Sequence, residues 1–368
     1  MSALPRLSEL SRPGEPLGSE FAKYCWLLAR ARGDLMQAAA EAPRFDGSAP
    51  AVSRLLKSAS DAGTTTDVSW ASTLVGYKQV VGPFVELVGR QSVIGKLAAS
   101  MRRVPFLTRT IVETTQATSG GFVGEAKPVP VTEFGFATAT LDQHKAGALA
   151  VVTAELLKSW SPATQQNILD LLSNAVVRAL DNALLNPATA AVSGTNPASL
   201  TYGITGFAST GNSATALVAD LKALLQRFLV NGSDLVNVAL VVHPTTALMM
   251  STLNTGGVRV FADMNATGGF IWGVPVVTTA SGIVSSGSPL AYPIVGIDCS
   301  RVLIADDQIA VVDASGHAAL QMDNAPSSSA AQVISMFQSN MVALRILRWI
   351  TWQRAADSAV EIVTNVAS

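Results

Sequence analysis

Residues 161–186, SPATQQNILDLLSNAVVRALDNALLN, carry the clearest helical pattern in the chain. Ser161 is a residue type that caps helices, and Pro162 stands in the first turn, where its missing N–H costs nothing. Apolar residues recur along this stretch at helical spacing, among them Leu172, Val176 and Leu180. At about 1.5 Å per residue the helix spans roughly 37 Å, which is long for a small domain. The pattern therefore predicts a long helix that joins two parts of a subunit.

Ahead of this helix, two β-rich stretches flank a segment rich in Gly and Pro. Residues 108–115 are dense in Thr, Ile and Val, and residues 134–139 resume the same pattern. Two such strands around a turn-forming segment predict a long β-hairpin. The segment between them has little apolar content, so the hairpin tip cannot fold onto a core of its own. We expect it to need a partner surface or to stay mobile.

The rest of the chain mixes helices with short strands in no strict β–α–β order. This arrangement indicates an α+β fold. The expected elements are a helix over residues 19–42, a second amphipathic helix over 215–230, a turn at Asp306–Asp307 between two short strands, a β-prone run over 333–352 and a final strand over 359–363.

The composition is apolar and poor in charge. Hydrophobic residues make up 49% of the 368 residues and charged residues only 14%, whereas charged residues make up about 25% of an ordinary soluble domain. Such a chain is expected to bury much surface between subunits or to expose many neutral Ser, Thr and Gly residues. The formal net charge is −1 and no basic stripe is visible, which argues against a protein that reads nucleic-acid sequence.

Cysteine content and hydropathy indicate the cellular compartment in which the protein is expected to fold. The two cysteines, Cys25 and Cys299, rule out a disulfide framework and favour a reducing compartment. The first ten residues lack the apolar core of a secretory signal. No stretch reaches 18 uninterrupted apolar residues, so the sequence predicts no membrane span.

The sequence contains no recognisable catalytic motif. The three histidines, His144, His243 and His317, have no neighbouring pattern that would orient a catalytic base. No His, Cys, Asp and Glu spacing suits a metal ion. We therefore predict a protein that is not an enzyme and has no cofactor. The remaining pattern, projecting elements without a core of their own, is expected of chains that interlock with copies of themselves.

Several short motifs, in their order and spacing, resemble the major capsid proteins of tailed phages, the HK-ninety-seven-type family. These motifs are FVGEAKPVPVTEF at 122–134, TLDQHKAG at 140–147, TAELL at 153–157, VVHP at 241–244, TGGFIWGVPVV at 267–277 and IVGID at 294–298. The resemblance covers the chain from about residue 63 to residue 368. Each motif is short, and the GEAKP and GVPVV elements carry most of the resemblance.

The resemblance implies a division of the chain into named parts. A possible scaffolding-like extension occupies residues 1–62, the N-terminal arm and start of the peripheral domain 63–107, the extended loop 108–140, the peripheral domain with the spine helix 141–211, the axial domain 212–330, and the return strands of the peripheral domain 331–368. The extended-loop tip, which assembly would use, comprises Gly120, Gly121, Gly124, Glu125 and Lys127. In many family members a phage protease removes the extension.

For function, the resemblance implies a head protein that self-assembles as hexamers and pentamers into an icosahedral shell around double-stranded DNA, without sequence-specific binding. The expected partners are a portal and, in some members, scaffold, protease or decoration proteins, with no membrane. The protein would lie in the virion, and in the host cytoplasm before assembly.

Some family members join subunits by an isopeptide bond between a loop lysine and an asparagine, assisted by a buried acid. Lys127 and Asn340 fall near the matching positions, but Leu347 occupies the place of the acid. Without a base to take the lysine proton the reaction should fail, so we expect no cross-link.

Two alternatives stay open at this point. An encapsulin-like bacterial compartment shares the fold and would enclose an enzyme instead of a genome; genomic neighbours would distinguish it from a phage or prophage shell. A hydrolase with a cryptic site is the remote alternative, and turnover that depends on His144 or His243 would support it.

Overall fold

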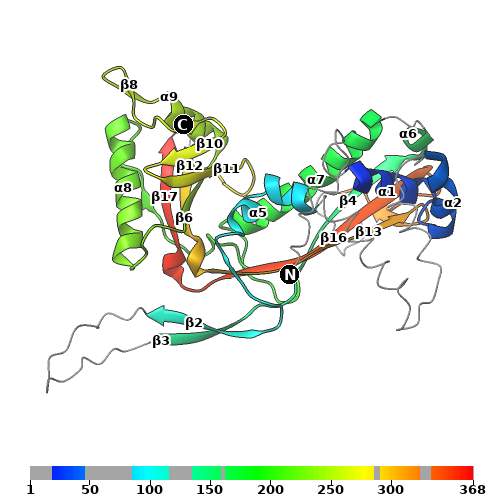
Figure 1. Cartoon of the computed structure of the whole chain (residues 1–368), viewed down its shortest axis with the longest axis horizontal. Helices are drawn as coiled ribbons and strands as arrows, with labels where there is room; N and C mark the ends of the chain where they lie inside the picture. Colours follow the sequence, from blue (N-terminus) through cyan, green and yellow to red (C-terminus); the bar gives the residue numbers. More distant parts are fainter. Residues whose placement is uncertain are drawn as a thin grey trace, which may run out of the picture. The chain divides into compact units, whose positions relative to one another are not determined.

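The computed structural model describes residues 19–45, 85–115, 135–158, 162–285, 291–323 and 333–367 (Figure 1). The chain divides into two compact units. Unit 1 takes its described residues from Met1–Arg90, Ala146–Val177 and Asp307–Trp349. Unit 2 takes them from Gln91–Lys145, Arg178–Asp306 and Ile350–Ser368.

Unit 1 combines helices with long strands. Its elements are α1 (Ser19–Arg30), α2 (Leu35–Phe45), a helical stretch at 85–91 that ends at the unit boundary, β4 (Lys145–Thr153), α6 (Ala154–Lys158), β14 (Ala319–Gln321) and β15 (Val333–Ser335). Four labelled elements contain residues of both units: β4, whose first residue Lys145 belongs to unit 2, α7 (Pro162–Leu185), β13 (Val302–Ser315) and β16 (Met341–Arg354). The long strands belong to a four-stranded sheet in the order β1-β13-β16-β4, and β14 pairs with β15.

Unit 2 is built on a seven-stranded sheet in the order β5-β17-β12-β6-β11-β10-β9. Its helices are α5 (Val93–Leu97), α8 (Ala214–Val230), α9 (Pro244–Thr252) and the 3-10 turns η2 (Cys299–Arg301) and η3 (Asp357–Ala359). Its strands are β1 (Arg102–Arg103), β2 (Arg109–Thr115), β3 (Gly135–Thr140), β5 (Phe207–Ala208), β6 (Val238–Val242), β7 (Asn254–Thr255), β8 (Val258–Arg259), β9 (Met264–Asn265), β10 (Gly268–Ile271), β11 (Val274–Thr278), β12 (Ala291–Asp298) and β17 (Val360–Ala367).

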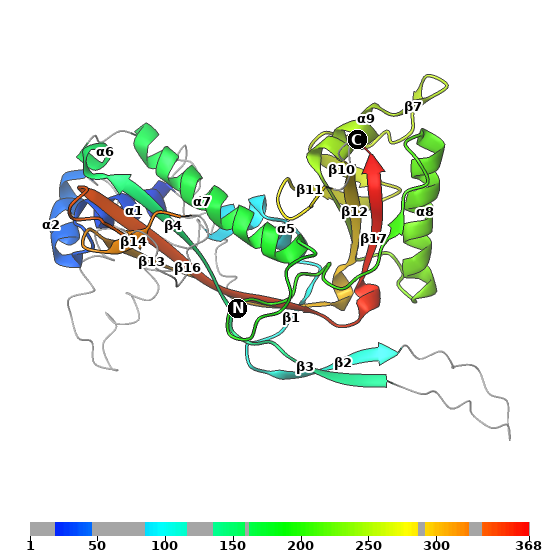
Figure 2. The same cartoon turned by 180° about the vertical axis from the view of Figure 1, so that it is seen from behind.

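The core of unit 2 forms where α8 covers this sheet. Figures 1 and 2 draw α8 beside β17, and the two elements are in contact. All five residues of β6 are buried, as expected for a central strand covered on both faces. Gly296 of β12 allows close packing, because a Cβ there would come within 2.8 Å of Leu224 and Phe228 of α8. Ser213 caps the helix by accepting a hydrogen bond from the Ala216 N–H.

The long helix predicted at 161–186 is confirmed as α7, which spans Pro162–Leu185. The three residues predicted to define one face, Leu172, Val176 and Leu180, are all buried. Just beyond the end of the helix, the Asn186 side chain accepts a hydrogen bond from the Ala188 N–H.

The expected hairpin is also present. β2 pairs antiparallel with β3, from Arg109 opposite Thr140 to Thr115 opposite Gly135. These two strands form a sheet of their own and pair with no third strand in the part of the chain that the structure describes. The predicted tip residues Gly120, Gly121, Gly124, Glu125 and Lys127 lie outside the described residues.

The single helix expected over residues 19–42 is wrong, because α1 and α2 are separated by a tight turn. Arg32 and Gly33 both have positive φ, and their N–H groups donate back to the carbonyls of Ala29 and Leu28. This pair of bonds is the Schellman pattern that ends helices. Asp34 then caps α2 by accepting from the N–H groups of Met36 and Gln37. Gly33 and Asp34 are residue types that end and begin helices. The apolar periodicity on both sides of them nevertheless favoured the prediction of one continuous helix.

The turn expected at Asp306–Asp307 is wrong as well. β13 continues from Val302 to Ser315 without a break. In the sheet order β13 lies between β1 and β16, and β1 pairs with Leu303 and Ile304, just before the two Asp residues. This pairing overrides the turn preference of two consecutive Asp residues.

The final strand appears as β17, and it pairs with β12 in the seven-stranded sheet. The last strand of the 331–368 segment thus shares a sheet with strands of the 212–330 segment. The domain division implied by the family resemblance remains a prediction.

The buried face of α7 can be tested by a pair of adjacent substitutions. We expect Leu172→Ala to lower the free energy of unfolding by about 2–5 kcal/mol, because Leu172 is only 1% exposed. Leu171→Ala is the matched control, since Leu171 is 58% exposed and its loss should cost less than about 0.5 kcal/mol. Urea unfolding of unassembled subunits, followed by circular dichroism, measures both. Equal effects of the two substitutions would contradict the placement of this face.

Candidate assembly sites

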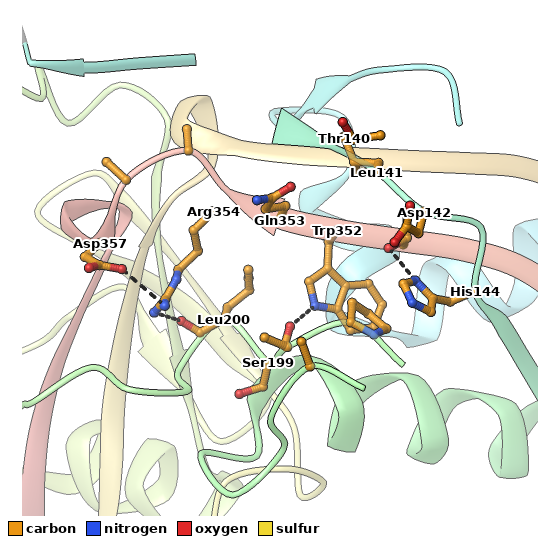
Figure 3. A pocket seen from close by; sticks show the side chains of 16 residues that line it. Thr140, Leu141, Asp142, His144, Ser199, Leu200, Trp352, Gln353, Arg354 and Asp357 are labelled. Carbon is orange, nitrogen blue, oxygen red and sulfur yellow. Dashed lines mark hydrogen bonds and ion pairs between the residues drawn. The ribbon is translucent and has the colours of Figure 1, made fainter. Parts of the chain in front are cut away.

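A pocket of about 630 Å³ lies in unit 2, next to the base of the β2–β3 hairpin (Figure 3). Residues from β3, from the 197–200 loop and from the end of β16 line it. Those that carry its polar contacts include His144, Ser199, Trp352, Arg354 and Asp357.

The polar groups of this pocket hold its own walls together. Trp352 Nε1 donates to the Ala198 carbonyl at 2.9 Å, and Arg354 Nη1 donates to the Leu200 carbonyl at 3.0 Å. Arg354 also pairs with Asp357 at 3.2 Å. Burial lowers the pKa of Arg354, and the charge of Asp357 acts in the opposite direction. These contacts fix the 197–200 loop against β16, so the pocket is foremost a structural junction.

His144 does not form part of a catalytic constellation among the described residues. Its side chain is buried, and its Nδ1 lies 3.0 Å from the hydroxyl of Thr351, which is buried too. The contacts recorded for His144 include no carboxylate that could orient it as a base. The arrangement suits a core histidine that joins the start of β4 to β16.

His243 has a structural role at the start of α9. Its Nδ1 accepts a hydrogen bond from the Thr245 N–H at 3.2 Å and thereby caps the helix. Its ring stacks on Tyr292 at 3.8 Å between centroids. Burial lowers the pKa of His243, which favours the neutral ring that this cap requires. His317, the third histidine, stacks on Phe337 in unit 1.

Asp181 of α7 is a buried carboxylate that joins three segments of unit 2. It accepts hydrogen bonds from the Val93 N–H at 2.9 Å and from the Thr279 hydroxyl at 2.8 Å. Burial raises the pKa of Asp181, while these two hydrogen bonds and Lys96 act to lower it. Sequence reasoning missed this residue, because only the tertiary structure shows that Asp181 is enclosed.

Asn340, the predicted partner of the cross-link, lies in the turn before β16 with φ of 51°. Its Nδ2 donates to Glu155 Oε1 at 2.7 Å, and Arg32 Nη2 donates to its Oδ1 at 3.4 Å. Leu347, at the position expected to hold an acid, lies on β16 beside Gly147. Helix α6 thus places the carboxylate of Glu155 next to Asn340, at a position other than that of Leu347.

Large apolar side chains remain exposed on both units of the single subunit. In unit 1 they are Leu35, Met36, Leu149, Leu156, Leu171, Met322, Val333 and Phe337. In unit 2 they include Leu229, Val230, Val236, Leu248, Val258, Phe270 and Trp272. Exposed apolar groups in such number are typical of surfaces that contact other chains.

Trp272 is the most unusual of these exposed residues. It occupies the turn between β10 and β11 with φ of 51°, followed by Gly273 with φ of 84°. Positive φ at both central positions defines a turn that normally selects Asn, Asp or Gly. A bulky aromatic residue held there, half exposed and in edge contact with Phe261, is a candidate interface residue.

Comparison with known proteins identifies the family. Residues 77–361 match the model of the phage capsid family. The chain belongs to this family. The prediction of a tailed-phage capsid protein with a mixed α+β fold is confirmed, and the encapsulin-like and hydrolase alternatives are not favoured.

A curated relative supports the same family. The capsid polyprotein of Pseudomonas phage PAJU2 is 34% identical over 320 residues, which are 84% of this chain and 47% of that protein. The chain thus spans about half the length of this relative.

Solved structures share the fold. One from Mycobacterium phage Ogopogo matches with a TM-score of 0.51 and 20% identity, over 74% of this chain and 92% of that chain. The capsid of an empty GTA particle matches with a TM-score of 0.50 and 14% identity, over 75% of this chain and 90% of that chain.

None of the helices among the described residues is long and apolar enough to cross a membrane. Within the same residues, no group of three or more His, Cys, Asp or Glu side chains is placed to hold a metal ion.

Asp181 predicts a pH-dependent difference between two variants. Because its pKa is raised in the folded subunit, its contribution to stability is largest in acid and is lost as the pH rises through that pKa. Asp181→Asn cannot titrate and keeps an acceptor for the Val93 N–H. As the pH rises from about 4 to about 7, we expect the free energy of unfolding of this variant to increase relative to that of wild type. Urea midpoints at the two pH values measure the change.

Asp181→Ala is the contrasting variant. It leaves the Val93 N–H without its acceptor and should lose about 1–3 kcal/mol at either pH. A constant difference between wild type and Asp181→Asn across the pH range would show that the carboxyl group does not titrate as inferred.

The absence of a cross-link remains a prediction. Glu155 is exposed, whereas the acid that assists the reaction in other family members is buried. We expect assembled shells to dissolve into single subunits on a denaturing SDS gel. A ladder of covalent multimers that Glu155→Gln abolishes would refute this and identify Glu155 as the missing acid.

Proposed function

We propose that this chain is the major head protein of a tailed phage or prophage and self-assembles into an icosahedral shell. The subunits form hexamers and pentamers around double-stranded DNA, and the protein acts as a building element and not as an enzyme. The observation that carries the proposal is the family match over residues 77–361, combined with a two-stranded hairpin that has no third strand among the described residues.

The hairpin supports assembly on energetic grounds. An isolated pair of strands is at best marginally stable in water, and it gains stability when it packs against another surface. In the described residues β2 and β3 pair only with each other. A neighbouring subunit supplies the packing surface that such a hairpin requires.

The exposed apolar side chains and the low charge support the same conclusion. Only 14% of the residues are charged, and large apolar groups such as Trp272, Val230 and Phe337 face solvent in the single subunit. Obligate assemblies bury thousands of Å² between chains and use apolar contacts to do so. Assembly therefore covers surface that an isolated subunit leaves exposed to water.

The remaining partners follow from this role. A portal interrupts the shell, and scaffold, protease or decoration proteins act on it in some systems. Packaged double-stranded DNA lies inside without sequence-specific contacts, in keeping with the net charge of −1. The protein resides in the virion after assembly and in the host cytoplasm before it.

Electron microscopy of the purified protein tests the proposal. We expect closed particles of uniform size, and particles recovered from phage-producing cells should contain nuclease-protected DNA. Gly124→Pro in the extended loop should reduce closed particles at least tenfold, because proline fixes φ and removes an N–H from the docking loop. Gly124→Ala, which keeps the N–H, is the control.

A stable monomer that forms no particles at high concentration would overturn the proposal. Particles that enclose a protein cargo and no DNA would support the encapsulin-like alternative instead.

A further inference from the structure

The N-terminal helix α1 is buried on all sides, although sequence reasoning placed it in a removable extension. From Phe21 to Ala29 only Lys23 is more than 5% exposed. The buried residues of α1 include Phe21, Trp26 and Leu27, and the first two are completely inaccessible to solvent. A helix that is buried all round belongs to the core of a folded unit.

The α1–α2 pair forms a compact helical hairpin. Arg30 lies over the ring of Trp26 at 5.1 Å and pairs with Glu41 of α2 at 2.7 Å. Ala38 and Ala42, on the inner face of α2, are fully buried. Helix α1 also contacts α6, which follows β4 in unit 1.

The turn of this hairpin is fitted closely to β13. A Cβ on Gly33 would come within 2.2 Å of the Ala314 carbonyl oxygen, so only glycine fits there. Its φ of 91° is also a conformation that other residues avoid. The turn also lies close to Gly316, just after the end of β13. A Cβ on Gly316 would come within 3.2 Å of three carbon atoms of the Arg32 side chain.

A polar contact joins the same turn to two further segments. Arg32 donates to Asn340, and Asn340 donates to Glu155 of α6. The hairpin turn, α6 and the turn before β16 are thus linked by consecutive hydrogen bonds. These contacts connect the hairpin to segments more than 100 positions away in sequence.

We propose that residues 19–45 are a permanent part of the core of unit 1 and are retained in the mature shell. The proposal rests on the proposed capsid function, because it concerns subunits in a shell. It differs from the scaffolding-like role implied for residues 1–62, since proteolytic removal of α1 and α2 would expose the apolar surfaces that they bury. Any processing of the N-terminal region therefore spares residues 19–45.

Mass spectrometry of mature, DNA-filled particles tests this directly. Trypsin releases YCWLLAR, residues 24–30, from α1, and WITWQR, residues 349–354, from β16. Against isotope-labelled standards, we expect the two peptides in a molar ratio near one. Loss of the first peptide from mature particles, with the second retained, would overturn the proposal.

A second measurement needs no particles and so separates this proposal from the capsid function. In the purified subunit, Gly33→Ala should lower the thermal unfolding midpoint by several degrees, because the added methyl group collides with the Ala314 carbonyl. Gly257→Ala is the control, since its φ of 84° gives a similar backbone strain but a Cβ there meets no atom within 4 Å, so its midpoint should fall clearly less.

Equal falls in the midpoints of Gly33→Ala and Gly257→Ala would show that the α1–α2 hairpin is not docked on β13, and would overturn the proposal. If no particles form but Gly33→Ala is destabilised as expected, the capsid function fails while the core role of α1 and α2 stands.

Discussion

The burial of apolar helix faces is the constraint on which the subunit depends. In α7 the residues Leu172, Val176 and Leu180 form one buried face, and Asp181 follows directly on the same helix. Because the helix is fixed by this face, the Asp181 carboxylate is held where it can bind the Val93 N–H and the Thr279 hydroxyl. A stripe of apolar residues thus places a buried carboxyl group, which joins α7 to the start of α5 and to Thr279, the residue after β11.

Periodic patterns predicted the parts of this fold that depend on local sequence. The long helix at α7 and the β2–β3 hairpin follow from the spacing of apolar and β-branched residues alone. The errors arose where non-local pairing overrides local preference. The two Asp residues at 306 and 307 favour a turn by themselves, yet β13, which lies beside β16 in the sheet, continues through them. At Arg32–Gly33 the stop signal was local, but the apolar residues on both sides concealed it.

Residues of the candidate sites were harder to predict than the elements that carry them. Asp181 and Glu155 are ordinary acidic residues in helices until the fold brings partners from 88 and 185 positions away. Trp272 belongs to a motif that the sequence did reveal, but its strained turn conformation and its exposure are properties of the folded chain. Burial and exposure decide such roles, and neither can be read from residue identity without the tertiary contacts.

The N-terminal hairpin shows how packing can define a boundary that sequence resemblance leaves vague. The family resemblance was expected to begin near residue 63, and the family match begins at residue 77, which suggests that everything earlier is separable. The contacts of α1 and α2 argue otherwise, because a removable segment should leave a surface that tolerates water. Trp26 has no exposed surface, and Gly33 leaves no room for a methyl group. A segment outside the shared family region has therefore become part of the core, and the unit needs it in the same sense that it needs the sheet strands.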